Sequence, residues 1–138
     1  MTTVVATPDF MCADRQVNPG PLFETTKLRR IRGSIYGICG NLDLCMSFLL
    51  WRMQKLDELT LSADAEFAAL EINEQGMWYW NGSLVPMPIK GKHYAIGSGA
   101  QYALGALDSG KSPQEAIRVA SGRDEHTGRR VQTLRLRR

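Results

Sequence analysis

The first residue with evident chemical potential is Thr2, which follows Met1 at the start of Met1-Thr2-Thr3-Val4. If Met1 is removed, Thr2 carries a hydroxyl nucleophile beside its own free α-amine. An amine with a pKa of about 7.7–8.0 can act as the base that activates the hydroxyl near neutral pH. The plainer alternative is that Thr2 only precedes the first strand, because threonine is common in strands. The choice depends on whether the chain supplies partners for such a nucleophile.

A terminal threonine needs three further groups, and the sequence has a candidate for each. Lys27 could lower the pKa of the amine, Asp14 could hold that lysine, and the N–H of Gly40 could stabilise an oxyanion. Asp14 ends an expected strand and Lys27 opens the next, so both can lie near residue 2. The alternative is that Asp14 is a turn residue and Lys27 a solvent-facing charge, because such residues occur in most chains of this size.

The elements that must position these groups can be predicted from periodicity and turn residues. Strand-like runs, each bounded by turn residues, occur at the following positions: 3–6, 10–13, 27–31, 34–39, 67–72, 77–80, 94–96 and 131–136. Helices are expected from Leu42 to about Leu59, with Asn41 as N-cap, and over 98–107 and 113 to about 120. Val85-Pro86-Met87-Pro88 cannot be a central strand, because proline donates no ladder hydrogen bond.

This order of elements predicts an α+β fold. The hairpins indicate antiparallel sheets, and the helices occur in blocks instead of alternating with strands. Two antiparallel sheets packed face to face, with helices outside them, satisfy the pattern. With 138 residues, we expect residues 1–138 to form a single domain with a basic tail at 135–138.

Composition narrows the class further. The net charge of +3 does not by itself indicate a nucleic-acid partner, and we interpret the arginines near the C-terminus as a solvated basic end. Cys12, Cys39 and Cys45 show no CxxC spacing, so we expect small buried thiols in a reducing compartment. His93 and His126 lack metal-ligand spacing. The sequence shows neither a signal peptide nor an apolar run long enough for a bilayer, and we expect a cytoplasmic protein.

Several motifs, in order along nearly the whole chain, resemble the catalytic β-subunits of the proteasome and the bacterial protease HslV. Both belong to the N-terminal-nucleophile (Ntn) hydrolases. The matching motifs are Thr2-Thr3-Val4-Val5, Ala13-Asp14-Arg15, Lys27-Leu28-Arg29-Arg30, Ile38-Cys39-Gly40, Ile96-Gly97-Ser98-Gly99, and Arg123-Asp124 with Thr127-Gly128. Each motif is common alone, and their order makes the set specific. The resemblance implies a four-layer αββα sandwich.

The resemblance also implies a role for each matched residue. Thr2 would be nucleophile and base, Asp14 would pair with Lys27, and Gly40 would receive the oxyanion. Three residues would complete the hydrogen-bond shell around the Thr2 amine: Ser98, Asp124 and Thr127. Two would belong to the substrate pocket: Ile38 as part of its wall, and Asn18, where the family usually has Thr or Ser.

The implied reaction is peptide-bond hydrolysis through an acyl-ester on Thr2, without a metal or organic cofactor. The implied partners are polypeptide substrates, further copies of the chain in a homo-oligomer, and an ATP-driven unfoldase; no membrane or nucleic-acid partner is expected. Plainer interpretations remain for two matched residues: Ser98 as an N-cap, and Asp124 as a partner of Arg123 or Arg129.

The chain departs from the family in one stretch. Between the expected helix at 42–59 and the strand at 67 there is no room for the second long helix of the family, so we expect a reduced helix layer. In the family that pair of helices contributes to ring stacking and subunit contacts. An Ntn-fold assembly protein without catalysis therefore stays open as an alternative. An Ntn amidase acting on a small molecule also stays open, because the same nucleophile serves any amide.

Overall fold

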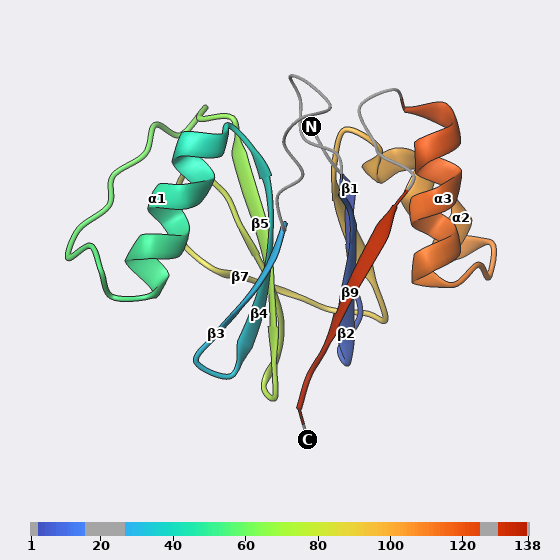
Figure 1. The fold of residues 1–138 in the computed structure, drawn as a ribbon, viewed down its shortest axis with the longest axis horizontal. Helices are drawn as coiled ribbons and strands as arrows, with labels where there is room; N and C mark the ends of the chain where they lie inside the picture. Colours follow the sequence, from blue (N-terminus) through green and yellow to red (C-terminus); the bar gives the residue numbers. More distant parts are fainter. Residues whose placement is uncertain (1–2, 16–26, 125–129, 138) are drawn as a thin grey trace.

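The chain folds into four layers, helix on sheet on sheet on helices (Figure 1). The structure is a computed structural model that describes residues 3–15, 27–124 and 130–137. Helix α1 (Leu42–Arg52) covers the outer face of one sheet. Helices α2 (Ala100–Asp108) and α3 (Pro113–Arg123) cover the outer face of the other. The predicted α+β sandwich is confirmed.

One sheet has four antiparallel strands in the order β8-β1-β2-β9. They are β1 (Thr3–Ala6), β2 (Phe10–Asp14), β8 (Tyr94–Gly97) and β9 (Val131–Arg135). Strand β1 is central and pairs Val4 with Ala13 on one side and with Ile96 on the other. Residues 3–6 therefore form a buried strand, flanked by the strands that carry Asp14 and lead to Ser98.

The second sheet has five antiparallel strands in the order β3-β4-β5-β6-β7. They are β3 (Leu28–Ile31), β4 (Ser34–Gly40), β5 (Phe67–Asn73), β6 (Gly76–Trp80) and β7 (Met87–Ile89). The proline-containing β7 lies at the edge, as its missing donors require. The β3–β4 turn places Arg32 and Gly33 at φ of 52° and 81°, which suits a tight hairpin.

Successive side chains of a strand point to opposite faces of its sheet. The buried apolar residues of the two sheets therefore form three clusters. One lies between the sheets and includes Val4, Met11, Leu28 and Leu70. A second lies under α2 and α3, and a third, rich in aromatic rings, lies under α1. Every sheet face thus has an apolar partner, which is the main source of stability for such a layered fold.

Helix α1 is shorter than its periodicity predicts. Asn41 caps its start, as expected, by accepting a hydrogen bond from the Leu44 N–H at 3.2 Å. The helix ends at Arg52, however, not near Leu59, and Gln54 then takes a left-handed φ of 61°. The apolar spacing continued past the helix because Leu59 and Leu61 pack as loop residues against the same cluster.

The other two helices also differ slightly from prediction. Helix α2 begins after Gly99, so the prediction that it starts at residue 98 is wrong. Helix α3 begins with the predicted capping box of Ser112 and Glu115, and extends to Arg123. No helix occurs in residues 53–66, all of which the structure describes, in agreement with the expected loss of a helix from that layer.

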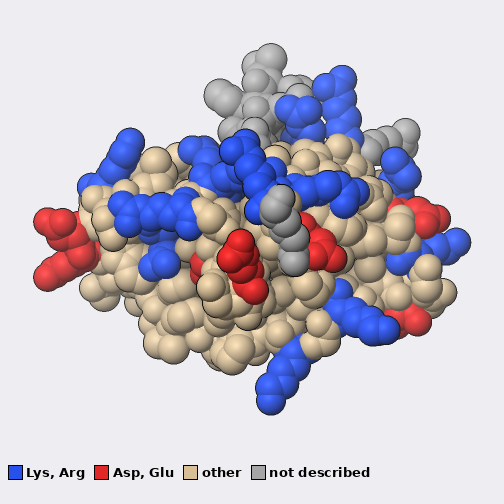
Figure 2. Space-filling view, turned by 90° about the horizontal axis from the view of Figure 1, so that it is seen from below, with Lys and Arg blue, Asp and Glu red and all other residues tan. Residues whose placement is uncertain are grey.

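Basic side chains gather on one face of the molecule. Figure 2 shows Lys and Arg spread over the face seen from below, around the C-terminal end. Exposed arginines among the described residues include Arg29, Arg30 and Arg32, from β3 and its turn, and Arg135 and Arg137, near the end of the chain. The predicted basic tail begins inside β9, where the Arg135 guanidinium lies 4.6 Å from the Phe10 ring centroid. Among the described helices, none is long and apolar enough to span a membrane.

Candidate active site

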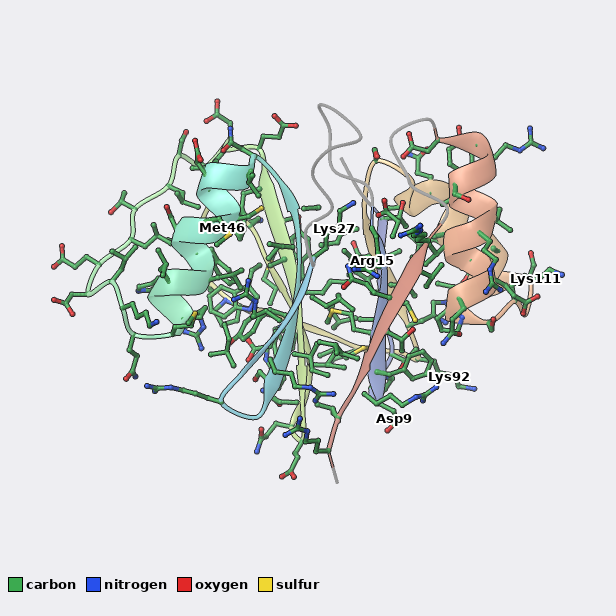
Figure 3. The ribbon with its side chains drawn as sticks, viewed as in Figure 1. Asp9, Arg15, Lys27, Met46, Lys92 and Lys111 are labelled. Carbon is green, nitrogen blue, oxygen red and sulfur yellow. The ribbon has the colours of Figure 1, made fainter. Side chains whose placement is uncertain are left out.

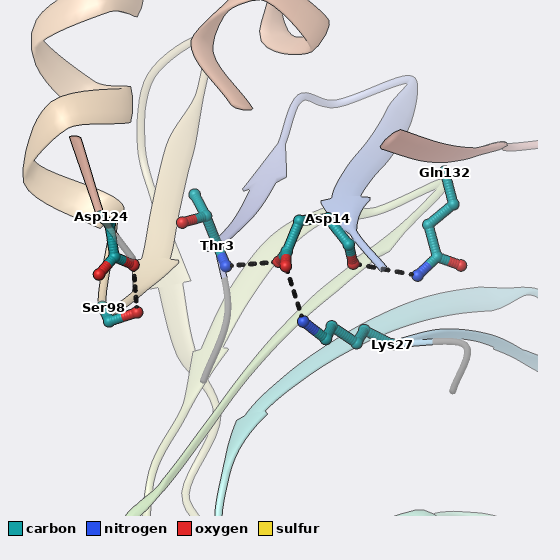
Figure 4. A network of polar contacts seen from close by, with 6 residues as sticks. All are labelled: Thr3, Asp14, Lys27, Ser98, Asp124 and Gln132. Carbon is teal, nitrogen blue, oxygen red and sulfur yellow. Dashed lines mark hydrogen bonds and ion pairs between the residues drawn. The ribbon is translucent and has the colours of Figure 1, made fainter. Parts of the chain in front are cut away.

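A buried ion pair between Asp14 and Lys27 is the centre of the site (Figure 4). Lys27 Nζ donates to Asp14 Oδ2 at 2.9 Å, and Asp14 and Lys27 are 0% and 6% exposed, respectively. Asp14 is the last residue of β2, and Lys27 directly precedes β3 in the other sheet. The pair therefore bridges the sheets, and the alternatives of a turn aspartate and a solvent-facing lysine are wrong.

Burial changes the acid–base properties of the lysine. Removal of the ammonium group from water lowers the pKa of Lys27, and the neighbouring Asp14 carboxylate only partly offsets this effect. The ammonium is thus held by a carboxylate in a poorly solvated position between the sheets, where Figure 3 shows Lys27 and Arg15. A charge in such a place acts strongly on any titratable group beside it.

The second oxygen of Asp14 holds the first residue of β1. Asp14 Oδ1 accepts a hydrogen bond from the backbone N–H of Thr3 at 2.9 Å, so one carboxylate joins β1 to Lys27 (Figure 4). Thr3 is fully buried. No pattern in the sequence indicates this contact, because its donor is a backbone group that every residue except proline carries.

Ser98 and Asp124 form a second polar pair beside the start of β1. Ser98 Oγ donates to Asp124 Oδ2 at 2.5 Å. Ser98 follows Gly97, which pairs with Thr3 in the sheet, and Asp124 is the C-cap of α3. The N-cap interpretation of Ser98 is wrong, since Gly99 caps α2 and the serine hydroxyl bonds to Asp124 instead.

Gly40 occupies a corner that only glycine fits. It ends β4 with a φ of +111°, and a Cβ there would lie 2.3 Å from the Glu66 carbonyl oxygen. A side chain is therefore excluded both by conformation and by contact. The corner at which β4 turns into α1 thus depends on this glycine.

Ile38 lies on the face of β4 that packs under α1, and is 7% exposed. Its backbone N–H donates to the Lys27 carbonyl oxygen at 3.0 Å, which connects it to the lysine strand. Cys39, on the opposite face of the strand, has its thiol pKa raised to about 12, mainly by burial, while the charge of Lys27 lowers it. The sequence predicted only a packing role for Cys39, so its closeness to the charge of Lys27 was not expected.

Three predicted site residues lie outside the described residues: Thr2, Asn18 and Thr127. Four of the described ones form two pairs, Asp14 with Lys27 and Ser98 with Asp124, both beside the start of β1. The described residues hold no cluster of three or more potential metal ligands.

Comparison with known proteins identifies the fold. No family model matches the chain, and no curated protein sequence matches it. Among solved structures, HslV from Trypanosoma brucei superposes with a TM-score of 0.73 at 18% identity, covering 99% of each chain. The Thiobacillus denitrificans protein BPH superposes at 0.73 and 18% identity, covering 98% of this chain and 97% of that one. The complex of BPH with epoxomicin superposes with a TM-score of 0.71 at 18% identity, covering 100% of this chain and 100% of that one.

The fold is thus that of the Ntn-hydrolase sandwich. The particular proteins it is similar to are HslV and BPH, over essentially the whole chain. At this level of identity the likeness concerns the fold, and the chemistry must be argued from the residues of the chain itself.

Proposed function

We propose that this protein is a threonine-type endopeptidase whose nucleophile is Thr2, set free by removal of Met1. The observation that supports this most is the double contact of Asp14, which accepts from the Thr3 N–H and from Lys27 at 2.9 Å each. It connects a buried ammonium group to the first amide after residue 2.

Covalent geometry extends this argument by one residue. The Thr3 nitrogen is the peptide nitrogen shared with residue 2, so the α-carbon of residue 2 lies about 2.4 Å from it. An α-amine on that carbon would be within a few ångströms of the Asp14–Lys27 pair. A nearby ammonium disfavours the protonated amine and lowers its pKa, which keeps it available as a base at neutral pH.

The proposed reaction has two stages. The Thr2 hydroxyl attacks the substrate carbonyl while its amine takes the proton, and the Gly40 N–H donates to the oxyanion. The peptide C–N bond then breaks, the amine returns the proton to the leaving nitrogen, and an acyl-ester remains on Thr2. Water, deprotonated by the same amine, hydrolyses the ester and restores the hydroxyl.

The remaining residues would position these groups. Ser98 and Asp124, with Thr127, would orient the amine through hydrogen bonds. Ile38 and Asn18 would contribute to the pocket for the substrate side chain, and an isoleucine there favours apolar side chains.

Intact-protein mass spectrometry with epoxomicin tests the proposal, because a solved BPH structure contains this compound. Epoxomicin is a peptide epoxyketone, and its two electrophilic carbons can be attacked by a hydroxyl and an adjacent amine together. We expect a chain lacking Met1 that gains the mass of one epoxomicin, and no gain in Thr2→Ala. A wild-type chain that keeps Met1, or gains no adduct, would refute the proposal.

Assembly and partners are part of the same proposal. We propose a self-compartmentalising homo-oligomer that acts on polypeptides in the cytoplasm and accepts them from an ATP-driven unfoldase. Enclosure would confine an otherwise unregulated peptidase.

A catalytically silent assembly protein is the second candidate, favoured by the absence of a helix in residues 53–66, a stretch that the structure describes throughout. Full biological function of a Thr2→Ala variant in the cell would support this candidate over the protease.

A further inference from the structure

A solvent-open hollow of about 500 Å³ lies at the far end of α1, away from Gly40. Six residues line it: Arg32, Trp51, Arg52, Gln54, Leu56 and Asp57. Helix α1 separates it from the candidate active site by about 16 Å along the helix axis, at about 1.5 Å per residue. None of the lining residues belongs to the proposed catalytic machinery.

The guanidinium of Arg52 is held in place before any ligand arrives. Its Nε donates to the Tyr36 hydroxyl at 3.0 Å. Its central carbon lies 5.0 Å from the centroid of the Trp80 ring and 5.3 Å from that of Trp51. Within the described residues, its terminal Nη groups have no hydrogen-bond partner. A fixed guanidinium with an unused edge is suited to a planar oxyanion, because little conformational entropy is lost on binding.

The side chains on which Arg52 lies are themselves held by hydrogen bonds. Buried Glu71 accepts hydrogen bonds from Ser34 Oγ at 2.6 Å and from Trp80 Nε1 at 3.0 Å. Burial raises the pKa of Tyr36 to about 12, so its hydroxyl stays neutral and accepts from Arg52. These contacts orient the rings on which the guanidinium rests.

A second guanidinium completes the hollow. Arg32 Nη2 donates to Gln54 Oε1 at 2.7 Å, and both residues have left-handed backbones, at φ of 52° and 61°. Neither is glycine, so each conformation costs free energy that the surrounding structure must offset. The two strained residues bring the β3–β4 turn and the end of α1 together around one hollow.

The charges of the lining favour an anionic ligand. Arg32 and Arg52 contribute two positive charges and Asp57 one negative charge, which leaves one positive charge. The lining is mostly polar, and Trp51 and Leu56 add a smaller apolar part to it. We infer that this hollow binds a small monocarboxylate with an apolar or aromatic skeleton, its carboxylate facing the two arginines. This inference does not depend on the proposed peptidase activity.

Titration of the ¹⁵N-labelled full chain with sodium benzoate tests the inference, followed through the Arg52 Nε–H and Trp51 indole signals. We expect saturable shifts, and affinity at least tenfold weaker for benzamide, which has the same ring without the charge. Arg32→Gln should weaken benzoate binding at least fivefold. Arg30→Gln, an exposed β3 arginine outside the hollow, should change it less than twofold.

A further variant gives an effect of opposite sign. Asp57→Asn removes the negative charge that the lining contains and should tighten benzoate binding two- to fivefold, independently of how Arg32→Gln folds. Equal responses to benzoate and benzamide, an effect of Arg30→Gln as large as that of Arg32→Gln, or weaker binding by Asp57→Asn would overturn the inference. Tighter binding of inorganic phosphate than of benzoate would also overturn it, since the site would then prefer a doubly charged oxyanion.

Discussion

The buried carboxylates of Asp14 and Glu71 have different environments. Asp14 contacts an ammonium group and the amide at the start of β1. Glu71, 7% exposed, accepts from neutral donors on the α1 side of the other sheet. A carboxylate that accepts from neutral donors favours a structural role, whereas the charged pair beside the start of β1 can change the pKa of a neighbouring group.

Glu71→Gln should destabilise the fold without affecting the proposed chemistry. The amide nitrogen would face a donor such as Trp80 Nε1–H or Ser34 Oγ–H, and the unsatisfied groups should cost about 1–3 kcal/mol. Urea unfolding measures the loss. Glu74→Gln, at the exposed tip of the β5–β6 hairpin, is the control and should stay within about 0.5 kcal/mol of wild type.

The buried thiols predict a loss of stability in alkali. Burial raises the pKa of Cys45 from 9.0 to about 12. The pKa of the Cys45 thiol is higher in the folded chain than in the unfolded chain, so its full contribution to the free energy of unfolding is present below pH 9. That contribution is lost as the pH rises from 9 toward 12. Between pH 8 and 10.5, wild type should lose about 2 kcal/mol relative to Cys45→Ser in urea unfolding. If the free energies of unfolding of the two proteins change in parallel with pH, the Cys45 thiol is not shielded from water in the folded chain.

At the scale of elements, local chemistry predicted the strands except β7, and it predicted most boundaries. Capping by Asn41 and Ser112 is a short-range property. Pro86 and Pro88 excluded only a central strand, which agrees with the edge position of β7. The end of α1 was mispredicted because Leu59 keeps the helical spacing while packing from a loop. Periodicity records which residues are buried, not whether the backbone between them is helical.

The candidate site was predictable only in part for a related reason. Asp14 and Lys27 could be proposed from residue type and resemblance, but their contact joins two sheets, which no local pattern encodes. The hollow at Arg32 and Arg52 was missed altogether, because it depends on the left-handed backbones of Arg32 and Gln54. Neither residue type favours that conformation.

The corner between β4 and α1 can be tested with two glycines. Gly40→Ala would face both an unfavourable φ and a 2.3 Å contact with the Glu66 carbonyl, while Gly91→Ala, at φ +124°, meets no atom within 4 Å. The strain alone should cost about 1–2 kcal/mol at Gly91. Gly40→Ala should cost at least about 1 kcal/mol more in urea unfolding. Equal losses would mean that the corner relaxes freely.

At the scale of the whole molecule, α1 leaves apolar side chains uncovered. Leu42 is 49% exposed and Met46 40%, although the opposite face of the same helix is buried. Exposed apolar groups on one element are typical of a surface that meets another chain.

Sedimentation velocity tests this whole-molecule expectation. We expect wild type to sediment as a multiple of the 15.4 kDa chain, and Met46→Glu to shift the distribution toward the monomer. Val85→Glu, at a 59% exposed loop residue, is the control and should leave the distribution unchanged. A wild-type monomer at micromolar concentration would contradict the proposed oligomer.

The rate of adduct formation with epoxomicin in an Asp14→Asn/Lys27→Met double variant tests the central claim most directly. The double change removes both charges of the pair, so neither is left buried without the other, and the new amide oxygen at position 14 can still accept from the Thr3 N–H. Circular dichroism and urea unfolding establish that the variant is folded, and exposed Lys55→Met is the control. The account predicts a rate at least a hundredfold below wild type for the double variant and an unchanged rate for Lys55→Met. A folded double variant that reacts as fast as wild type would show that the buried pair does not activate the chain terminus.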